Sequence, residues 1–458
     1  MAGIGFILRR LAQKDDLLSV ALSYSYAFII SSGPWILTSI TVVCALMLGS
    51  TFISHDDQET FRIIIIYNFS FSLVFSGPII IVATRFLSDM IYQKQVTEAT
   101  GLLVGSLIVL LGGQSLLAVP FYLQSNMSSM ERLQSIVGYL LVSGVWLITI
   151  FISALKGYRT IVLSFFIGLF LATILSSSLA MRYGLVGMLT GFNIGVSVIL
   201  FTLLARVLAE YPYPVRHPFK FLRKFPTYWM LSINGLLMNI SGWADKWIMW
   251  LSPQGKQTAS GLISYPDYDS AMFLAYMTII PSMAAFMVST ETRFFERYLM
   301  FFQSIYEHHS YSDIDNQRRA LLEDVLHSGR NLFILQGTIT ATVMLTSQPL
   351  FDFLEISYLQ LSMFRVGALG VFFYIMTLFI LTILTYFDLQ KPVLMINALY
   401  LSLNILFTVL AMNFGLPYYG FGYLAASLLV FSAAYITLFH HLERLPYYVF
   451  IKNNPSLR

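Results

Sequence analysis

Charged residues are scarce in this chain of 458 residues, and their scarcity limits what the protein can be. Only 11% of the residues are charged, and the formal net charge is +4. A soluble globular domain carries about a quarter charged residues. Hydrophobic residues make up 57% of the chain, and the mean hydropathy is +0.72. A soluble fold could not cover its surface with so few charges, so the composition indicates a membrane protein.

Residues and motifs for catalysis or metal binding are also lacking. Cys44 is the only cysteine, which excludes an internal disulfide and a metal site made of several cysteines. No Gly-x-x-x-x-Gly-Lys-Ser/Thr loop is present, so we do not expect ATP hydrolysis by this chain. Asp313-Ile314-Asp315 resembles a glycosyltransferase metal motif, but its loop is too short for the nucleotide-binding domain such a site requires. The two histidine pairs are adjacent rather than spaced i, i+4. We therefore predict that the protein is not an enzyme and holds no cofactor or metal.

Long apolar segments are abundant. Each contains about 20 residues or more, enough for a helix to cross a hydrocarbon core about 30 Å thick. Runs such as Ile63 to Ile66 do not alternate between apolar and polar residues, as strands of a membrane β-barrel do. The predicted fold class is an all-α integral membrane protein with about twelve transmembrane helices. We place them at 20–48, 61–85, 99–122, 133–155, 159–180, 184–206, 225–251, 269–291, 331–353, 364–387, 391–413 and 420–441.

The distribution of Lys and Arg predicts which side of the membrane each loop faces. With the N-terminus inside, only four of the 27 basic residues lie on the outer side: Arg62, Arg132, Arg182 and Lys256. Lys246 and Arg365 lie within or at the edge of spans, which leaves 21 on the inner side. This bias follows the positive-inside rule and places both termini in the cytoplasm. The first apolar stretch is too long for a signal-peptide core and is expected to remain in the protein.

A proline-containing basic segment separates the chain into two halves of six spans each. We predict an N-terminal six-helix bundle at 1–210, a cytoplasmic linker at 211–224, a C-terminal six-helix bundle at 225–441 and a cytoplasmic tail at 442–458.

Two short motifs recur at the same offset in the two halves. Thr84-Arg85-Phe86 recurs as Thr292-Arg293-Phe294, and Gly33-Pro34-Trp35 falls on Ser241-Gly242-Trp243. Because both matches lie in equivalent spans, they predict two pseudo-symmetric bundles. An even number of spans in each unit gives both halves the same orientation, a pattern found in secondary transporters.

The longest predicted cytoplasmic segment within the C-terminal half is 293–330. Its first apolar residues follow i, i+3, i+4 spacing, which predicts an amphipathic helix at the membrane surface. Asp313, Asp315 and Gly329 are expected to interrupt or end the helical stretches that follow. Two interpretations remain open: an interfacial helix that ties the half-bundles together, or a docking surface for a cytosolic partner.

Charged residues inside spans are the first candidates for a substrate path, because inserting one costs about 2.5–3.5 kcal/mol. Asp245 and Lys246 lie in span 7. Sequence neighbours on a helix do not face each other, so each residue is expected to have its own environment. Lys246 can extend its stem to the outer interface, whereas Asp245 cannot, and Arg365 is a candidate partner for Asp245. Trp243 belongs to a tryptophan stripe that is equally consistent with an aromatic belt.

The remaining candidates are gate residues, polar groups within spans and hinges. Arg85 and Arg293 are either inner-side anchors or gate residues, with Asp89 and Glu291 as matching acids. The other path candidates are Trp35, Asn68 and Asn239. Asn68 and Asn239 belong to a set of amides that either hydrogen bond between helices or line a wet path: Asn68, Gln114, Asn193, Asn234, Asn239, Asn397 and Asn404. The hinge candidates are Pro34, Pro78 and Pro281, since proline removes a helical hydrogen bond and kinks the helix.

Three segments of this sequence resemble the PelG family of membrane transporters, which act in the Pel exopolysaccharide pathway. They are Met1-Ala2-Gly3-Ile4-Gly5-Phe6 with Leu8-Arg9-Arg10, then Ser32-Gly33-Pro34-Trp35, and then Gly242-Trp243-Ala244-Asp245-Lys246-Trp247. The resemblance covers essentially the whole chain. Ile7 departs from it where an acidic residue is expected, which puts any role for a charge there in doubt.

The resemblance implies membership of the multidrug/oligosaccharidyl-lipid/polysaccharide flippase superfamily, whose two six-helix bundles open a central cavity alternately to each side. It implies a bacterial inner-membrane transporter that moves an N-acetylhexosamine-rich exopolysaccharide from a cytosolic synthase to the periplasm by a gated central cavity. The implied partners are a cytosolic glycosyltransferase (PelF-like) and membrane proteins that are PelD-like and PelE-like. Two alternatives remain: a drug/cation antiporter of the same superfamily, and a non-transporting membrane scaffold for the synthase.

Overall fold

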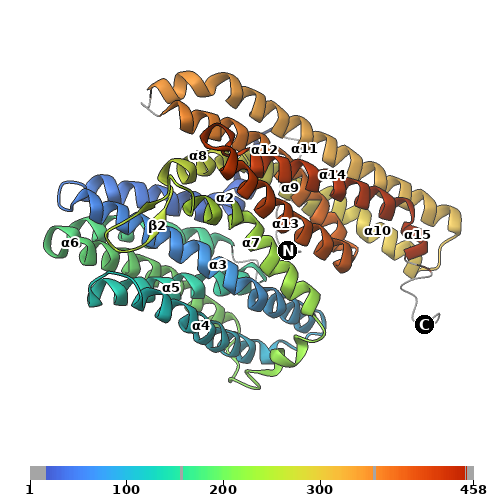
Figure 1. Ribbon diagram of the computed structural model, residues 1–458. Coiled ribbons are helices and arrows are strands. Elements are labelled where there is room, and N and C mark those ends of the chain that lie inside the picture. Colours follow the sequence, from blue (N-terminus) through green and yellow to red (C-terminus); the bar gives the residue numbers. More distant parts are fainter. Residues whose placement is uncertain (1–16, 155–157, 354–356, 449, 451–458) are drawn as a thin grey trace. The chain divides into compact units, whose positions relative to one another are not determined.

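The computed structural model describes residues 17–154, 158–353, 357–448 and 450. The opening motif from Met1 to Arg10 lies outside the described residues. Helices make up almost all of the described chain (Figure 1). The exception is an antiparallel pair of two-residue strands, β1 (Lys256–Gln257) and β2 (Ile263–Ser264), in the loop after α7.

The first half of the chain forms five long helices. Their bounds are α2 (Leu17–Gly49), α3 (His55–Tyr92), α4 (Ala99–Leu123), α5 (Ser129–Ala154) and α6 (Tyr158–Glu210), with a short 3-10 turn η1 at Val96–Glu98. Two of the predicted spans lie in α6, which is broken at Gly184. The backbone there has φ 57° and ψ −135°, a conformation that glycine adopts readily because it has no Cβ.

Glycines also allow the two parts of α6 to pack closely. A Cβ on Gly191 would lie 2.2 Å from the Ser176 nitrogen, and one on Gly195 would lie 2.4 Å from the Gly168 oxygen. Small residues of this kind let membrane helices approach each other closely. Residues 158–183 and 185–210 therefore correspond to the fifth and sixth predicted spans.

The second half of the chain begins with a 3-10 turn, η2, at Lys220–Lys224. The elements that follow are α7 (Trp229–Trp250), α8 (Pro266–Met277), α9 (Ile280–Ser289), a π-helical turn η3 (Thr290–Phe294), α10 (Phe295–Tyr306), α11 (Tyr311–Phe353), α12 (Tyr358–Tyr386), α13 (Gln390–Phe414), η4 (Leu416–Tyr418), α14 (Phe421–Glu443) and α15 (Leu445–Tyr447). Each predicted span of this half falls on α7, α11, α12, α13 or α14, except span 8, which covers α8, α9 and the start of η3. Within the described residues, nine helical segments are long and apolar enough to cross a membrane.

Contacts divide the chain into two compact units. One contains Ser32–Trp243 and Trp250–Tyr265, and the other contains 17–31, Ala244–Met249 and the described residues from 266 to 450. In the first unit, α3, α4, α5 and α6 pack on one another around buried residues such as Phe61, Phe151 and Phe192. In the second unit, α12 is the central helix, because it contacts α8, α11 and α14.

The segment at 293–330 differs from its prediction. Asp313, Asp315 and Gly329 do not interrupt a helix, because all three lie within the continuous α11. Asp313 and its neighbour Ser310 form the start of α11, where Ser310 Oγ accepts a hydrogen bond from the Asp313 N–H at 3.2 Å. Asp315 accepts hydrogen bonds from Arg318 and Arg319, one turn further along. Aspartate in the first turn stabilises a helix rather than ending it.

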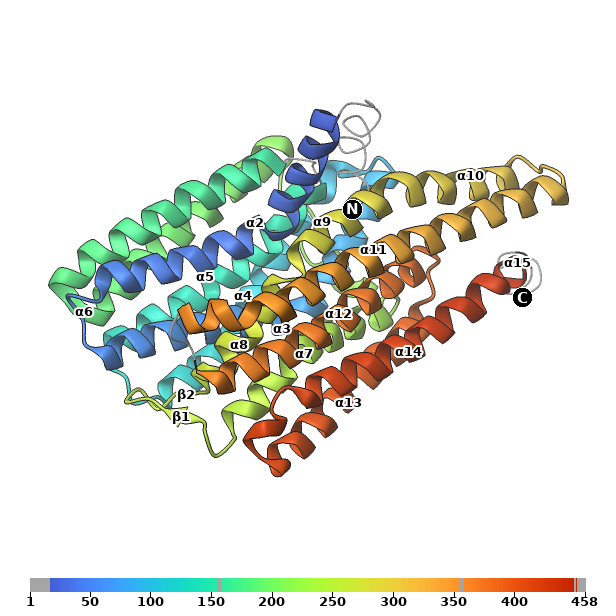
Figure 2. The same ribbon diagram turned by 90° about the horizontal axis from the view of Figure 1, so that it is seen from above.

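The same segment forms a helical hairpin, and its first arm, α10, is the helix predicted from the i, i+3, i+4 spacing. Its place at the membrane surface stays a prediction. Figure 2 shows α10 running beside α11, and the two helices are in contact. The α11 helix has 43 residues, which at about 1.5 Å per residue makes it roughly twice as long as a hydrocarbon core is thick. Part of α11 must therefore extend beyond the hydrocarbon core.

Candidate functional site

The first unit contains a network of neutral polar side chains on α3, α4 and α5. Gln114 Nε2 donates to Ser76 Oγ at 3.0 Å, and Gln114 Oε1 accepts from the Tyr139 hydroxyl at 2.5 Å. Trp146 Nε1 donates to Ser72 Oγ at 3.1 Å. Gln114 is 2% exposed, and a buried polar group that is hydrogen-bonded avoids the cost of desolvation. This network links three helices without any charge.

Asn68 is the centre of a second neutral cluster. Its Nδ2 donates to the Ser135 carbonyl at 3.2 Å, and its Oδ1 accepts from the Tyr122 hydroxyl at 2.6 Å. Gly138 allows this arrangement, because a Cβ there would lie only 3.0 Å from Asn68 Nδ2. Asn68 was a candidate for the substrate path, and in this structure its amide links helices.

Asn239 lies where α7 packs on α3 within the first unit. Its Nδ2 donates to the Leu73 carbonyl at 3.1 Å. Gly77 and Gly235 make the contact close, because a Cβ on Gly77 would lie 3.0 Å from the Gly235 oxygen. Asn239 is half-buried and also links two helices.

The second unit contains a buried ion pair. Asp245 is fully buried and Lys246 is 7% exposed. Lys246 Nζ lies 3.2 Å from both carboxylate oxygens of Asp245, and the Tyr268 hydroxyl donates to Asp245 Oδ2 at 3.0 Å. The expectation of separate environments was wrong. The long lysine stem turns its ammonium back onto the neighbouring carboxylate, which the directions of the two Cβ atoms alone do not reveal.

Tyrosine rings surround the ammonium. Lys246 Nζ lies 4.7 Å from the ring centre of Tyr276 and 6.0 Å from that of Tyr423, within range of a cation–π interaction. Tyr276 in turn contacts Tyr374, with ring centres 5.9 Å apart. Lys246 therefore does not extend to the outer interface. These tyrosines come from α8, α12 and α14, and no spacing in the sequence brings them together.

Arg365 and Asp245 are not partners in the described structure. Arg365 is half-buried, and its Nε donates to Ser347 Oγ at 2.8 Å, which joins α12 to α11. Because Lys246 and Tyr268 already contact the Asp245 carboxylate, Arg365 is not needed to neutralise it.

The two repeated arginines have different surroundings. Arg85 Nε lies 3.5 Å from Asp89 Oδ1, as expected, and its side chain is 53% exposed. Arg293 is exposed, whereas its expected partner Glu291 is buried and accepts a long hydrogen bond from the Tyr386 hydroxyl at 3.4 Å. Glu291 therefore contacts a tyrosine of α12, and the expected Glu291–Arg293 pair is not formed.

The tryptophan and proline candidates occupy helices of both units. Trp35 is 38% exposed on α2, and Trp243 is half-buried on α7. Pro34 and Pro78 lie inside the continuous helices α2 and α3, whereas Pro281 is the second residue of α9, after a break at Thr278 and Ile279. Proline at a helix start loses no hydrogen bond, so Pro281 marks the junction of two helices. A role in motion remains a prediction for all three prolines.

The described residues contain no group of three or more His, Cys, Asp or Glu that could hold a metal ion. The candidate site thus consists of neutral amide and hydroxyl networks in the first unit and an internally neutralised carboxylate among tyrosines in the second.

Comparison with known proteins adds two findings. The sequence model of the exopolysaccharide exporter (EPS-E) family PelG matches residues 1–450. No curated protein matches the chain in sequence.

Solved structures of similar fold are transporters. A multidrug resistance MATE family transporter of the MOP superfamily, in its outward-facing conformation, has 12% identity and a TM-score of 0.62, with coverage of 92% of this chain and 96% of that chain. A multidrug resistance MATE family transporter in an inward-facing conformation has 14% identity and a TM-score of 0.55, with coverage of 92% of this chain and 95% of that chain. A MOP superfamily transporter from Pyrococcus furiosus has 12% identity and a TM-score of 0.56, with coverage of 91% of this chain and 96% of that chain. At this identity the likeness concerns the fold alone, and it confirms the predicted fold class of two six-helix bundles.

Proposed function

Because the chain belongs to the PelG family of exopolysaccharide exporters, we propose that it moves a Pel-like, N-acetylhexosamine-rich exopolysaccharide from a cytosolic synthase to the periplasm. The protein is a multi-pass membrane transporter by family and fold. The match over residues 1–450 is the observation that carries the finer proposal. We place the protein in the bacterial inner membrane with both termini in the cytoplasm, in agreement with the bias of basic residues.

The buried polar chemistry supports a neutral glycan as the substrate. An acetylated sugar presents hydroxyl and amide groups and apolar C–H faces, so it can be held by hydrogen bonds and aromatic rings without a net charge. Both units offer side chains of these kinds: amides and hydroxyls around Gln114 and Asn68, and tyrosines around Lys246. The side chains that now form hydrogen bonds with one another would form hydrogen bonds with the sugar instead as the gated passage opens.

The Asp245–Lys246 pair supports transport without a coupling cation at this carboxylate. A free sodium ion or proton would bind where the Lys246 ammonium already lies, 3.2 Å from both Asp245 oxygens. The ammonium is covalently tethered and cannot leave with each transport cycle. We therefore propose that polymerisation by the synthase, rather than ion exchange at Asp245, pushes the chain outward.

The first alternative is a drug/cation antiporter. The MATE-like fold favours it, since one such structural neighbour is a multidrug resistance transporter. A cationic substrate needs an available carboxylate, however, and the fully buried Asp245 already binds Lys246. A non-transporting scaffold is the second alternative, and a translocation assay in vesicles separates it from a transporter.

The proposed partners follow from the family resemblance. A PelF-like glycosyltransferase would deliver the polymer on the cytoplasmic side, with PelD-like and PelE-like membrane proteins in the same assembly. Affinity purification of the full chain from its native membrane tests this, and recovery of the chain without these three proteins would contradict it.

Secretion by variants of the ion pair tests the proposed function. Asp245→Asn leaves the ammonium of Lys246 buried without its counter-charge, so loss of secretion could come from misfolding. The double variant Asp245→Asn with Lys246→Met removes both charges and keeps the volume. Asp56→Asn, at an exposed position, is the matched control. We expect normal abundance but reduced polymer secretion for the double variant, and unimpaired secretion would remove the pair from any essential step.

A further inference from the structure

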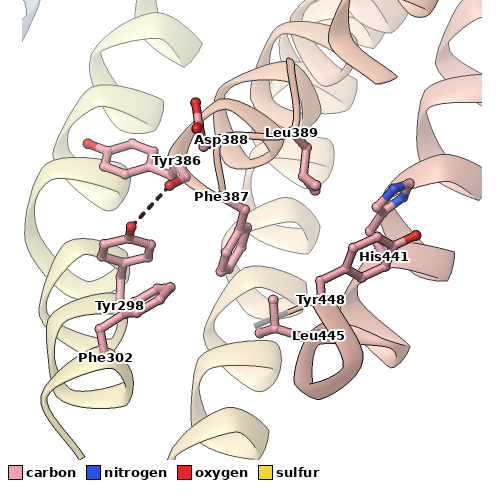
Figure 3. Close-up of a pocket in the computed structure, with 9 residues that line it drawn as sticks. All are labelled: Tyr298, Phe302, Tyr386, Phe387, Asp388, Leu389, His441, Leu445 and Tyr448. Carbon is pink, nitrogen blue, oxygen red and sulfur yellow. Dashed lines mark hydrogen bonds between the residues drawn. The ribbon is translucent and has the colours of Figure 1, made fainter. Parts of the chain in front are cut away.

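A cavity of about 280 Å³ lies at one end of the second unit, where α10, the α12–α13 loop and the end of α14 meet (Figure 3). One wall consists of Tyr298, Phe302 and Phe387, and the opposite wall of His441 and Tyr448. Asp388 lies at its edge. We call this cavity the aromatic slot. Its three segments all lie on the side predicted to be cytoplasmic.

Both walls consist of rings that contact one another. On the first wall, the Tyr298 ring centre lies 4.7 Å from that of Phe302 and 5.7 Å from that of Phe387. On the second, His441 and Tyr448 are stacked with centres 4.8 Å apart and planes at 24°. Figure 3 shows the two walls on either side of the cavity. Because both walls present rings, the aromatic slot is suited to a ligand with apolar faces.

Asp388 supplies a fixed hydrogen-bond acceptor at the edge of the slot. Its backbone adopts φ 55°, and its Oδ1 accepts from Gln390 Nε2 at 3.0 Å. A left-handed conformation is tolerated by aspartate but is uncommon for residues other than glycine. The residue is exposed, so its carboxylate can also accept a hydroxyl or amide hydrogen of a ligand.

The ligand class follows from this combination. Ligand pockets are mostly apolar with a few polar groups that fix orientation, and about 300 Å³ is the lower end of their range. The slot thus has room for about one sugar ring rather than a long segment of polymer. A hexosamine ring has apolar C–H faces for the walls and hydroxyl and amide hydrogens for Asp388. Among the described residues that line the slot there is no Lys or Arg, so the lining itself offers no direct partner for the phosphate of a lipid headgroup.

A cationic peptide is the strongest competing ligand, because aromatic faces and a carboxylate also suit a cation. Basic residues flank the slot on all three segments: Arg297 precedes Tyr298, Lys391 follows Gln390, and Arg444 precedes Leu445. Their positive charge disfavours a cation and is indifferent to a neutral sugar.

We propose that the aromatic slot is a carbohydrate-binding site that holds one N-acetylhexosamine unit of the polymer on the cytoplasmic side. This inference rests on the proposed function, because it names where the transporter first holds its substrate.

Binding to the purified full chain tests the proposal. The protein would be placed in phosphatidylcholine nanodiscs and titrated with the N-acetylglucosamine tetramer, with saturation-transfer NMR and calorimetry as readouts. We expect saturable binding that Tyr448→Ala weakens about tenfold, which corresponds to about 1.4 kcal/mol, the loss of one aromatic stacking contact. Tyr435→Ala is the matched control, because Tyr435 lies on α14, is 50% exposed and does not line the slot.

Two further variants keep the test decisive. Phe302→Leu removes a ring from the other wall while preserving apolar volume, and it should weaken binding even if Tyr448→Ala fails to fold. Asp388→Asn retains an acceptor oxygen, so it should change the affinity for the neutral tetramer little. If an arginine-rich peptide binds instead and Asp388→Asn abolishes that binding, the slot holds a protein partner and the sugar assignment is wrong.

The remaining outcomes separate the slot from the proposed function. Absence of saturable tetramer binding, or equal binding by the Tyr435→Ala and Tyr448→Ala variants, overturns the slot proposal. If cells with the wild-type chain still secrete polymer in that case, the proposed function stands. If cells that lack the chain secrete as much polymer as wild-type cells, the proposed function itself fails.

Discussion

At the residue scale, the two residues of the ion pair on α7 each need the other as a counter-charge. Asp245 and Lys246 are adjacent, buried and joined at 3.2 Å, and Tyr268 completes the surroundings of the carboxylate. Removing one partner of a buried pair is far more costly than replacing both, because it leaves an uncompensated charge in a medium of low dielectric constant. The stability of the second unit should therefore depend on the balance of these charges rather than on either charge alone.

This dependence gives a prediction about unfolding. Asp245→Asn should lower the free energy of unfolding of the detergent-solubilised protein by about 3–5 kcal/mol, because Lys246 is left unpaired. The double variant Asp245→Asn with Lys246→Met should recover most of the loss. Thermal unfolding followed by circular dichroism measures both changes. A double variant as unstable as the single one would show that the pair is not the unit of stability.

The sequence predicts only part of the environment of individual residues. Buried charge in span 7 is visible from composition, since Asp245 and Lys246 interrupt an apolar segment. Their mutual contact is not, because it depends on the rotamers of a long side chain. The two tyrosines nearest Lys246, Tyr276 and Tyr423, lie 147 positions apart in the sequence, so no local pattern identifies them. Gln114, by contrast, was recognised as a polar group within a span, and only its partners were unknown.

At the element scale, apolar length predicts the helices well, and glycine determines how closely they pack. Gly101 and Gly105 lie on the face of α4 that contacts the linker before α7. A Cβ on Gly105 would lie 1.7 Å from the Pro218 oxygen, whereas one on Gly112 of the same helix meets nothing within 4 Å. The linker 211–224 was predicted only as a loop, and the structure places its backbone directly on α4.

Replacing Gly105 by alanine should therefore displace the linker. We expect Gly105→Ala to make the bonds after Arg216 and Lys220 cleavable by trypsin at a lower enzyme concentration, and to cost about 1–3 kcal/mol of stability because the site becomes overpacked. Gly112→Ala is the matched control on α4. Limited proteolysis followed by mass spectrometry identifies the cleaved bonds, and equal cleavage in the two variants would contradict the contact.

The start of α11 gives a prediction with a pH dependence. The hydrogen bond from Arg318, with a further contribution from Arg319, holds the pKa of Asp315 below its ordinary value. A lowered folded-state pKa means that the ionised form favours the helix. Its contribution is present above the ordinary aspartate pKa and is lost as the pH falls through the lowered value.

Hydrogen exchange at the start of α11 measures this contribution. We expect Asp315→Asn to exchange faster than the wild type at neutral pH and at the same rate at a pH below the folded-state pKa. The effect should be small, because exposed ion pairs contribute little. If the difference in exchange rate between the two proteins persists unchanged at low pH, that difference does not come from the ionisation of Asp315.

At the scale of the whole molecule, hydropathy was sufficient to predict a multi-pass helical membrane protein, and the proline-containing linker with the repeated motifs predicted its two bundles. They could not predict the long hairpin of α10 and α11, because the acidic residues at its tip are typical of both loops and helix starts. The repeated Arg85 and Arg293 motifs agree with the two-bundle fold, yet their surroundings differ, since only Arg85 keeps its acidic neighbour as a partner.

Function at this scale depends on the family rather than on the fold. The structural neighbours share 12–14% identity with the chain, and one fold can host different substrates. The buried ion pair nevertheless narrows the choice of substrate, because the Lys246 ammonium already neutralises the Asp245 carboxylate. This arrangement supports the proposal of a neutral polymer driven by its own synthesis.

Polymer transfer into inverted inner-membrane vesicles tests this account most directly. Vesicles that contain the full chain and its synthase would be supplied with nucleotide sugar and then treated with a glycoside hydrolase that cannot cross the membrane. We predict that polymer accumulates inside the vesicles, protected from the hydrolase, and that the protected fraction persists when sodium and proton gradients are dissipated. Polymer that is synthesised but remains fully digestible outside the vesicles would contradict the account.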